Sequence, residues 1–285
     1  MKVATQTITD DLRRWIQAQR QAGCRPEDLV AAMRASGWDG SVAAAALRQV
    51  RREPPPSDGA DATAAAPARF PGPDLAGAPT LLRAGGRELR VLATMQRPRV
   101  VVFGGLLSDD ECAGLIALAA PRLLRSETVD NATGGSEVNA ARTSEGMFFE
   151  RGEAPLIAAI EQRIAELLRW PVAHGEGLQI LRYRPGAEYR PHHDYFDPGQ
   201  PGTARILQRG GQRVGTLVMY LNTPLGGGAT TFPEVGLEVA PVRGNALFFG
   251  YDRAHPDTRT LHGGAPVVAG EKWVATKWLR EGEFA

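Results

Sequence analysis

The chain has 285 residues, a formal net charge of +1 and a hydrophobic fraction of 43%. This length exceeds the usual single domain, so we expect one main domain with an appendage. The balanced charge gives no electrostatic case for nucleic acid or an anionic membrane as a partner, and the sequence lacks a run of about 18 apolar residues that would predict a membrane span.

The two cysteines, Cys24 and Cys112, fit neither a disulfide framework nor a zinc site. Residues 1–15 lack the apolar segment of a secretory signal. We therefore expect a soluble protein of the cytoplasm.

Residues 1–52 predict a small module of three short helices, one of which opens with Pro26 and two acidic residues. The run 22–47 resembles ubiquitin-associated (UBA-like) modules in its spacing. This resemblance implies a protein partner for the N-terminal helices. The alternative is a small helical cap that packs on the main domain.

Residues 53–80 are rich in Pro, Ala and Gly and poor in large apolar side chains, which predicts a flexible linker. The main domain is then expected at residues 81–285. Its first part predicts strands at 90–94 and 99–103 and a helix that opens with the capping-box sequence at Ser108.

A second amphipathic helix is expected at residues 154–170, because its isoleucines recur at helical spacing. After it, short apolar runs alternate with Gly/Pro turns, which predicts a mainly β, α+β domain. The expected fold is a jelly-roll (cupin-like) barrel buttressed by helices. The strands are expected at 177–183, 214–222, 230–232, 237–239, 246–249 and 273–279.

The candidate metal ligands begin with His192 and Asp194. On a strand, side chains two positions apart point to the same face, so this imidazole and carboxylate are expected to converge while His193 faces away. His262 offers a third ligand. Two histidines and one carboxylate form the facial triad of non-haem Fe(II) oxygenases, which leaves coordination positions open. The remaining histidines, His174 and His255, are expected to be structural or exposed.

Lys272 follows His262 by ten residues and lies in an expected strand. Alternation places Lys272, Val274, Thr276 and Trp278 on one face and Lys277 on the other. A lysine among apolar neighbours on an inward face needs an anion. We therefore expect Lys272 to meet an anionic co-substrate and Lys277 to be solvated.

These motifs together resemble the prolyl 4-hydroxylase family of 2-oxoglutarate- and Fe(II)-dependent dioxygenases. The resemblance runs from about Arg99 to Arg280 and covers the jelly-roll domain. The motifs that carry it are Tyr183-x-x-Gly-x-x-Tyr-x-x-His-x-Asp194, Gly227-Gly-Ala-Thr-Thr-Phe-Pro233, His262, Lys272-Trp273 and Arg142-Thr-Ser-x-Gly-x-Phe.

The resemblance implies that His192, Asp194 and His262 bind Fe(II), with 2-oxoglutarate and O2 as co-substrates and ascorbate as a reductant. It implies that Lys272 pairs with the distal carboxylate of 2-oxoglutarate and that Tyr183 hydrogen-bonds the same group. Two further residues are expected in the cofactor pocket, Thr216 as a second contact to that carboxylate and Trp278 as a wall. For Tyr183, Thr216 and Trp278 the alternative is barrel core.

The implied reaction is 4-hydroxylation of a proline-containing peptide or protein, with release of succinate and CO2. The glycine- and proline-rich loop 195–211 is expected to form a lid or substrate-binding flap, and together with loop 130–139 a groove for an extended peptide. The alternative for loop 195–211 is an ordinary flexible connector. One alternative keeps the chemistry on a free amino acid or small metabolite. The other is a non-catalytic binding module recruited through the N-terminal helices.

Overall fold

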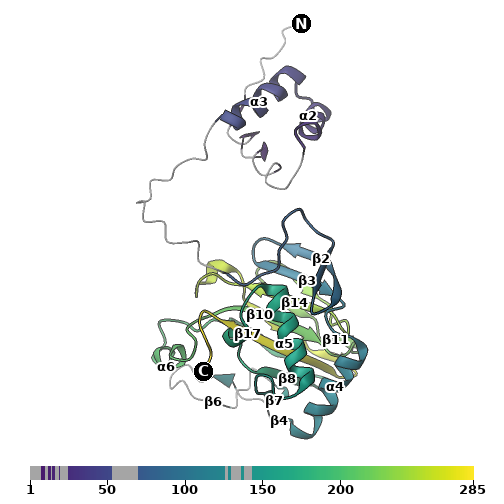
Figure 1. Ribbon diagram of the computed structural model, residues 1–285, viewed down its shortest axis with the longest axis vertical. Coiled ribbons are helices and arrows are strands. Elements are labelled where there is room, and N and C mark those ends of the chain that lie inside the picture. The colour runs from purple at the N-terminus through teal and green to yellow at the C-terminus, as the bar shows by residue number, and fades with distance from the viewer. Residues whose placement is uncertain are drawn as a thin grey trace. The chain divides into compact units, whose positions relative to one another are not determined.

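The structure is a computed structural model that describes residues 8, 9, 12, 13, 15, 16, 19, 25–52, 70–125, 128–129, 136–137 and 143–285. The chain divides into two compact units (Figure 1). The smaller comprises residues 1–68 with 75–78, and the larger residues 69–74 with 79–285. Among the described residues, no helix is long and apolar enough to cross a membrane.

The smaller unit contains α2 (Pro26–Ala35) and α3 (Gly40–Arg52). Pro26 and the acidic residues of the first turn begin α2 as expected, since a missing N–H costs nothing there and acids favour the helix dipole. The expected helix before α2 lies mostly outside the described residues, so the three-helix module stays a prediction. A small apolar core is nonetheless present, formed by Leu12, Ile16, Leu29, Met33, Ala43, Ala46 and Leu47.

The larger unit begins earlier than expected. The Gly72 amide donates to the Leu168 carbonyl at 2.8 Å, and the Arg99 guanidinium lies 5.0 Å from the centre of the Phe70 ring. Residues 70–74 therefore pack on the larger unit instead of ending the predicted linker. Residues 53–69 of that linker lie outside the described part of the chain.

The larger unit is mainly β, as predicted. Its major sheet has nine antiparallel strands in the order β1-β2-β3-β14-β10-β17-β8-β7-β4, and a four-stranded sheet has the order β13-β12-β15-β9. The strands of the major sheet are β1 (Leu81–Ala84), β2 (Arg87–Met95), β3 (Arg99–Gly104), β4 (Leu124–Arg125), β7 (Glu145–Phe149), β8 (Leu178–Tyr183), β10 (Arg213–Tyr220), β14 (Ala246–Gly250) and β17 (Lys272–Arg280).

The four-stranded sheet contains β9 (Tyr189–His192), β12 (Thr230–Phe232), β13 (Leu237–Val239) and β15 (His262–Gly264). Two-stranded pairs are formed by β5 (Thr128–Val129) with β6 (Ser136–Glu137) and by β11 (Gly226–Gly227) with β16 (Val267–Ala269). The helices are α4 (Asp109–Ala119), α5 (Pro155–Leu168) and α6 (Thr203–Leu207), with 3-10 turns η1 (Ala120–Arg122), η2 (Val172–His174) and η3 (Pro256–Thr258).

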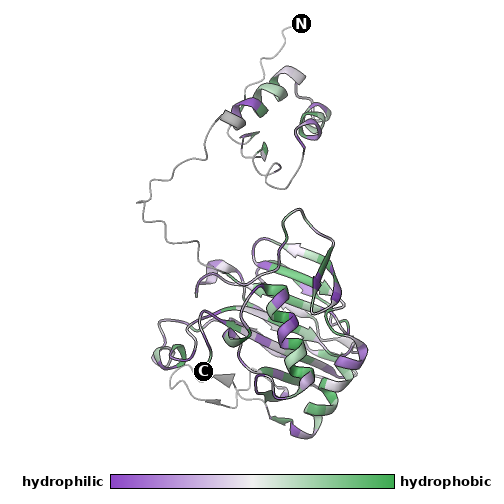
Figure 2. Ribbon diagram, in the orientation of Figure 1, coloured by the Kyte–Doolittle hydropathy of each residue, from purple (hydrophilic) through white to green (hydrophobic). Residues whose placement is uncertain are grey.

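Helices α4 and α5 cover one face of the major sheet (Figure 1). The capping box at Ser108 is confirmed, because its hydroxyl accepts from the Glu111 amide and its own amide donates to the Glu111 carboxylate. The predicted amphipathic helix is confirmed as α5. Ile157, Ile160 and Ile164 are buried along it, and hydrophilic residues mark its other side (Figure 2).

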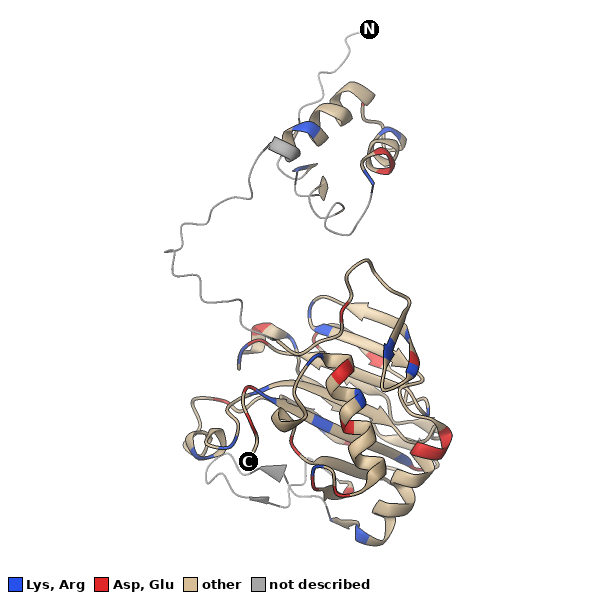
Figure 3. Cartoon of the chain, viewed as in Figure 1, with Lys and Arg blue, Asp and Glu red and all other residues tan. Residues whose placement is uncertain are grey.

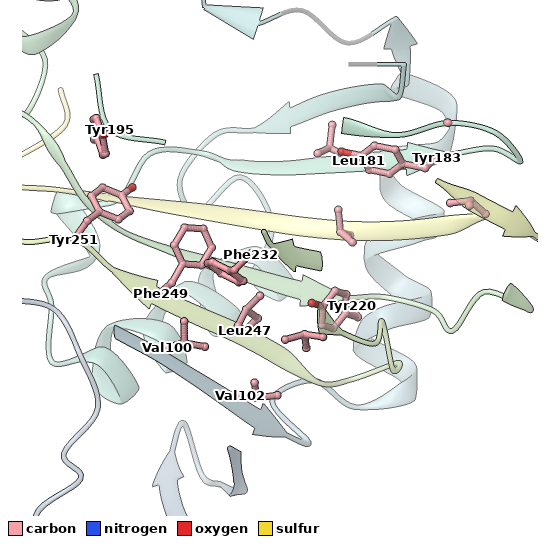
Figure 4. Packing of buried hydrophobic residues seen from close by; sticks show 14 residues of the cluster. Val100, Val102, Leu181, Tyr183, Tyr195, Tyr220, Phe232, Leu247, Phe249 and Tyr251 are labelled. Atoms are coloured by element: carbon pink, nitrogen blue, oxygen red, sulfur yellow. The ribbon is translucent and has the colours of Figure 1, made fainter. Parts of the chain in front are cut away.

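The four-stranded sheet covers the opposite face of the major sheet. Between the sheets Phe232 and Phe249 meet edge-on, with ring centres 5.3 Å apart, beside Leu247 and Tyr220 (Figure 4). Two facing antiparallel sheets with a shared apolar core are consistent with the predicted jelly roll.

The prediction of a solvated Lys277 is wrong. The residue does face away from Lys272, but that face of β17 is covered by α5, and Lys277 is only 2% exposed. Its ammonium donates to the Glu161 carboxylate and to the Glu176 carbonyl. Charged residues of both signs are otherwise interspersed over the unit (Figure 3).

We expect Lys277→Met to lower the free energy of unfolding by about 3–5 kcal/mol, because it leaves the buried Glu161 carboxylate without its cation. Urea unfolding followed by circular dichroism measures this loss. Adding Glu161→Gln should recover part of it.

The matched control is Arg83→Ala, which removes an exposed ion pair with Glu88. It should change the unfolding free energy by less than about 1 kcal/mol. A loss equally small in Lys277→Met would contradict a stabilising buried pair.

Candidate metal centre

Three potential metal ligands meet where β9 and β15 pair. His262 on β15 lies directly opposite His192 at the end of β9, and Asp194 follows two residues later. The Nε2 atoms of His192 and His262 each lie 3.5 Å from a different oxygen of Asp194. All three ligand atoms lie within 4.8 Å of one another. The predicted convergence is confirmed, although Asp194 lies beyond the strand.

Hydrogen bonds fix the tautomer of both imidazoles. The Nδ1 atom of His192 lies 2.9 Å from the Arg190 carbonyl, and that of His262 lies 2.9 Å from the Thr260 carbonyl. A carbonyl only accepts, so Nδ1 carries the proton in each ring. The Nε2 lone pairs therefore face Asp194 and are free to bind a cation.

The electrostatics suit a divalent cation. Burial disfavours the ionised form of Asp194, but His262, His192 and Arg213 outweigh it and hold the pKa of the carboxyl well below its usual range. Burial lowers the pKa of His262 to about 4, against the opposing effect of Asp194. At neutral pH the site therefore offers an anionic carboxylate beside a neutral imidazole.

A chain of hydroxyl groups orients the Asp194 carboxylate. The Thr216 hydroxyl donates to Oδ2 at 2.7 Å and lies 3.0 Å from the Tyr251 hydroxyl. Since the Thr216 proton is directed at the carboxylate, Tyr251 donates to Thr216. The sequence predicts Thr216 as a contact to the co-substrate, whereas its hydroxyl donates to the carboxylate of Asp194.

Arg213 holds the Asp194 backbone. Its Nη1 donates to the Asp194 carbonyl at 3.3 Å. Its Nε and Nη2 donate to the two oxygens of the Glu176 carboxylate, a bidentate pair at 2.6 and 2.9 Å. Arg280 donates to the same carboxylate at 2.7 Å. Tyr251, Arg213 and Glu176 are not among the site residues predicted from the sequence. The available signal was a charged or polar residue next to an apolar strand, since Arg213 begins β10, Glu176 precedes β8 and Tyr251 follows β14.

A cavity extends from the three ligands to Lys272. Tyr183, Thr216 and Trp278 line it, as predicted. On β17 the lining residues are Lys272, Val274, Thr276 and Trp278, which confirms the alternation expected for this strand. Tyr189 and Thr230 also line it and were not predicted as site residues.

Lys272 is 4% exposed and lies opposite Tyr183 on β8. Its ammonium lies 5.4 Å from the Tyr183 ring centre and 6.0 Å from that of Tyr220. No hydrogen bond or ion pair from the described residues reaches it, and burial lowers its pKa to about 8. A buried cation without a counterion makes this end of the cavity suited to an anion.

Thr230 belongs to the same end. The Tyr220 hydroxyl donates to Thr230 Oγ1 at 2.9 Å, so the Thr230 proton is available to a ligand. Thr230 lies opposite Gly264, where a Cβ would come within 3.8 Å of the Lys272 ammonium. Thr230 belongs to the motif at residues 227–233, but the sequence assigns it no role.

The other histidines stay outside the ligand cluster. The His193 ring stacks on Tyr195, with ring centres 4.6 Å apart, as expected for a residue that faces away from Asp194. His174 packs edge-on against Trp170, and His255 is exposed and caps a turn through Asp257. Within the described ranges, the three predicted ligands form the one cluster able to hold a metal ion.

The predicted flap contains the short helix α6 within loop 195–211. The Thr203 hydroxyl at its start donates to the Asp197 carbonyl at 2.6 Å. Of the predicted groove loop 130–139, only residues 136 and 137 are described, and Arg142 of the quoted motif also lies outside the described residues.

The larger unit is similar in sequence to known oxygenases. Residues 178–280 match the family model of the 2OG-Fe(II) oxygenase superfamily. Prolyl 4-hydroxylase 1 of Arabidopsis thaliana is 42% identical over 219 residues, which cover 70% of this chain and 75% of that protein. Probable prolyl 4-hydroxylase 3 of the same plant is 41% identical over 208 residues, covering 66% and 71%.

Among solved structures, a viral collagen prolyl hydroxylase from Paramecium Bursaria Chlorella virus-1, in its 2OG complex, is 30% identical to this chain. The match covers 64% of this chain and 94% of the viral chain, with a TM-score of 0.49.

We expect Thr216→Val to weaken binding of a divalent metal on the order of tenfold to a hundredfold, because it removes the hydrogen bond that orients Asp194. Anaerobic calorimetric titration with Fe(II), and with Co(II) as a spectroscopic probe, measures this directly. Thr94→Val, on an exposed part of β2, is the control and should leave the affinity unchanged. Equal affinities in both variants would contradict an orienting role for Thr216.

Proposed function

The chain belongs to the prolyl 4-hydroxylase family of 2OG-Fe(II) oxygenases, and on that premise we propose that it hydroxylates prolyl residues of peptides or proteins at carbon 4. The observation that carries this proposal is one cavity with the His192, Asp194 and His262 cluster at one end and, at the other, the Lys272 ammonium, which no described residue pairs.

The donor set fits Fe(II). Two neutral imidazole nitrogens and one carboxylate are the ligands of non-haem iron oxygenases, and the described residues offer no fourth ligand to block the open positions. Bound iron supplies the oxidation in which O2 and 2-oxoglutarate give succinate, CO2 and one hydroxyl group on the substrate. We propose ascorbate as the reductant that maintains Fe(II).

The other end of the cavity fits the distal carboxylate of 2-oxoglutarate. Lys272 supplies the charge, and we assign hydrogen bonds to Tyr183 and to Thr230, whose proton is available. Thr216 serves the metal side, since its hydroxyl is engaged by Asp194. Trp278 provides an apolar wall beside the substrate.

A peptide substrate is favoured over a free amino acid by the cavity lining. A free acid brings a second carboxylate and needs a second cation, whereas Lys272 is the one lysine or arginine among the lining residues of the described chain. The complete ligand cluster argues against a non-catalytic binding module. We retain two further proposals from the sequence: a protein partner for the N-terminal helices and a cytoplasmic location.

The direct test is mass spectrometry of proline-containing peptides after incubation with the protein, Fe(II), 2-oxoglutarate and O2. We expect a gain of one oxygen atom per modified proline, recovered as 4-hydroxyproline, with succinate formed in equal amount. Asp194→Ala should abolish both products. His193→Ala should retain most activity, because that ring faces away from the cluster, and its complete inactivity would contradict the ligand assignment.

We expect the affinity for 2-oxoglutarate to fall above pH 8. Burial lowers the pKa of Lys272 to about 8 when no anion is bound, so the ammonium is present below that pH and is lost above it. The co-substrate stays doubly anionic throughout, so its apparent Kd should be flat below pH 8 and rise about tenfold per pH unit above it. Anaerobic titration of the Fe(II) protein across this range measures the profile.

Lys272→Met removes the cation at every pH. Its Kd at pH 7 should be weaker on the order of tenfold to a hundredfold, since a charge-assisted hydrogen bond contributes about 1.5–3 kcal/mol. The rise above pH 8 should disappear, while iron affinity stays close to wild type. An unchanged profile in this variant would remove Lys272 from the co-substrate site.

A further inference from the structure

The face of the major sheet that forms the cavity continues past it toward the sheet edge. Two large apolar side chains lie exposed there, Phe148 on β7 and Leu124 on β4, with exposed fractions of 49% and 74%. Strands β8, β7 and β4 follow one another at this edge (Figure 1).

Strand register places both side chains on the cavity face, because directly opposed residues of antiparallel strands point the same way. Phe148 lies opposite Gln179, which lies opposite Thr276, and Thr276 lines the cavity. In the next row Leu124 lies opposite Gly146, which lies opposite Leu181, and Leu181 also lines the cavity.

Trp278, Phe148, Gly146 and Leu124 define an apolar strip on this face. The ring centre of Phe148 lies 6.4 Å from that of Trp278, which is itself part of the cavity wall. Gly146 has no side chain, so the sheet surface is low between Leu181 and Leu124. None of the four carries a charge, which favours an apolar occupant over an acidic or basic one.

Phe148 and Leu124, the outer part of the strip, are exposed, and exposed apolar surface next to a cavity marks a binding site. The surface of two side chains is far smaller than the area of about 800 Å² that each partner buries in a stable dimer. A single extended chain that leaves the cavity fits the strip better than a second copy of the protein.

We propose that the strip binds the part of the substrate peptide next to the target proline, through an apolar side chain that packs on Phe148. The proposal rests on the proposed prolyl hydroxylation and adds a sequence preference to it. An extended chain advances about 3.3 Å per residue, so the 6.4 Å from Trp278 to Phe148 corresponds to about two residues. The preferred residue therefore lies two positions from the hydroxylated proline, and Leu124 contacts the chain beyond it.

The test compares peptides that differ only at the second position on either side of one central proline, with leucine or serine there. Wild type and Phe148→Thr are assayed for peptide KM and, by fluorescence anisotropy without O2, for peptide binding. Threonine keeps the strand propensity at this position while removing the ring. On one side of the proline, we expect wild type to bind the peptide with leucine about tenfold more tightly than the peptide with serine. In Phe148→Thr that preference should be lost, with the serine peptide and the KM for 2-oxoglutarate unchanged.

Leu92→Thr, an exposed leucine on β2, is the matched control and should keep the preference. Equal effects on the leucine and serine peptides, or no effect, would overturn the strip as a substrate site. A change in oligomeric state of Phe148→Thr in size-exclusion chromatography would assign the strip to a second copy instead. A wild type that hydroxylates neither peptide but binds the leucine peptide more tightly overturns the proposed reaction alone, because the anisotropy preference still supports the strip.

Discussion

The ionised carboxylate of Asp194 lies buried between the two sheets and is stabilised by side chains from both of them. A carboxylate taken out of water is costly unless charges and hydrogen bonds surround it. Here Thr216 from β10 holds one oxygen, the two imidazoles face both oxygens, and Arg213 holds the backbone carbonyl. Strands β9, β10 and β15 therefore each supply a group that stabilises this carboxylate, and the metal site also connects the two sheets.

The charges behind Asp194 balance as a group. Arg213 and Arg280 carry two positive charges, and Glu176 and Asp194 carry two negative ones, so the buried network is neutral. The Glu176 carboxylate accepts hydrogen bonds from both arginines at 2.6 to 2.9 Å. The Arg213 guanidinium also lies 4.0 Å from the centre of the Trp278 ring. The network that supports the metal ligand thus also supports a wall of the cavity.

Strand β17 shows how one element serves stability and chemistry at once. Its two lysines point to opposite faces, and both are buried. Lys277 meets a carboxylate from α5 and completes a structural ion pair. Lys272 meets no anion from the described residues, and the desolvation that lowers its pKa is unopposed. Lys277 is therefore structural and Lys272 is available to an anionic ligand, because among the described residues only Lys277 has a carboxylate beside it.

Local spacing in the sequence is enough to predict the direction of several side chains. The pair His192 and Asp194, the cavity-facing side of Lys272 and the buried stripe of α5 follow from the periods of strands and helices. The capping box at Ser108 follows from the spacing of Ser108 and Glu111 at a helix start. The sequence does not show that both faces of β17 are covered, or which partner each hydroxyl group bonds. Lys277 pairs with Glu161, 116 residues away, and Thr216 with Asp194, 22 residues away. Spacing within a segment fixes the direction of a side chain, but what it meets there depends on elements that only folding brings together.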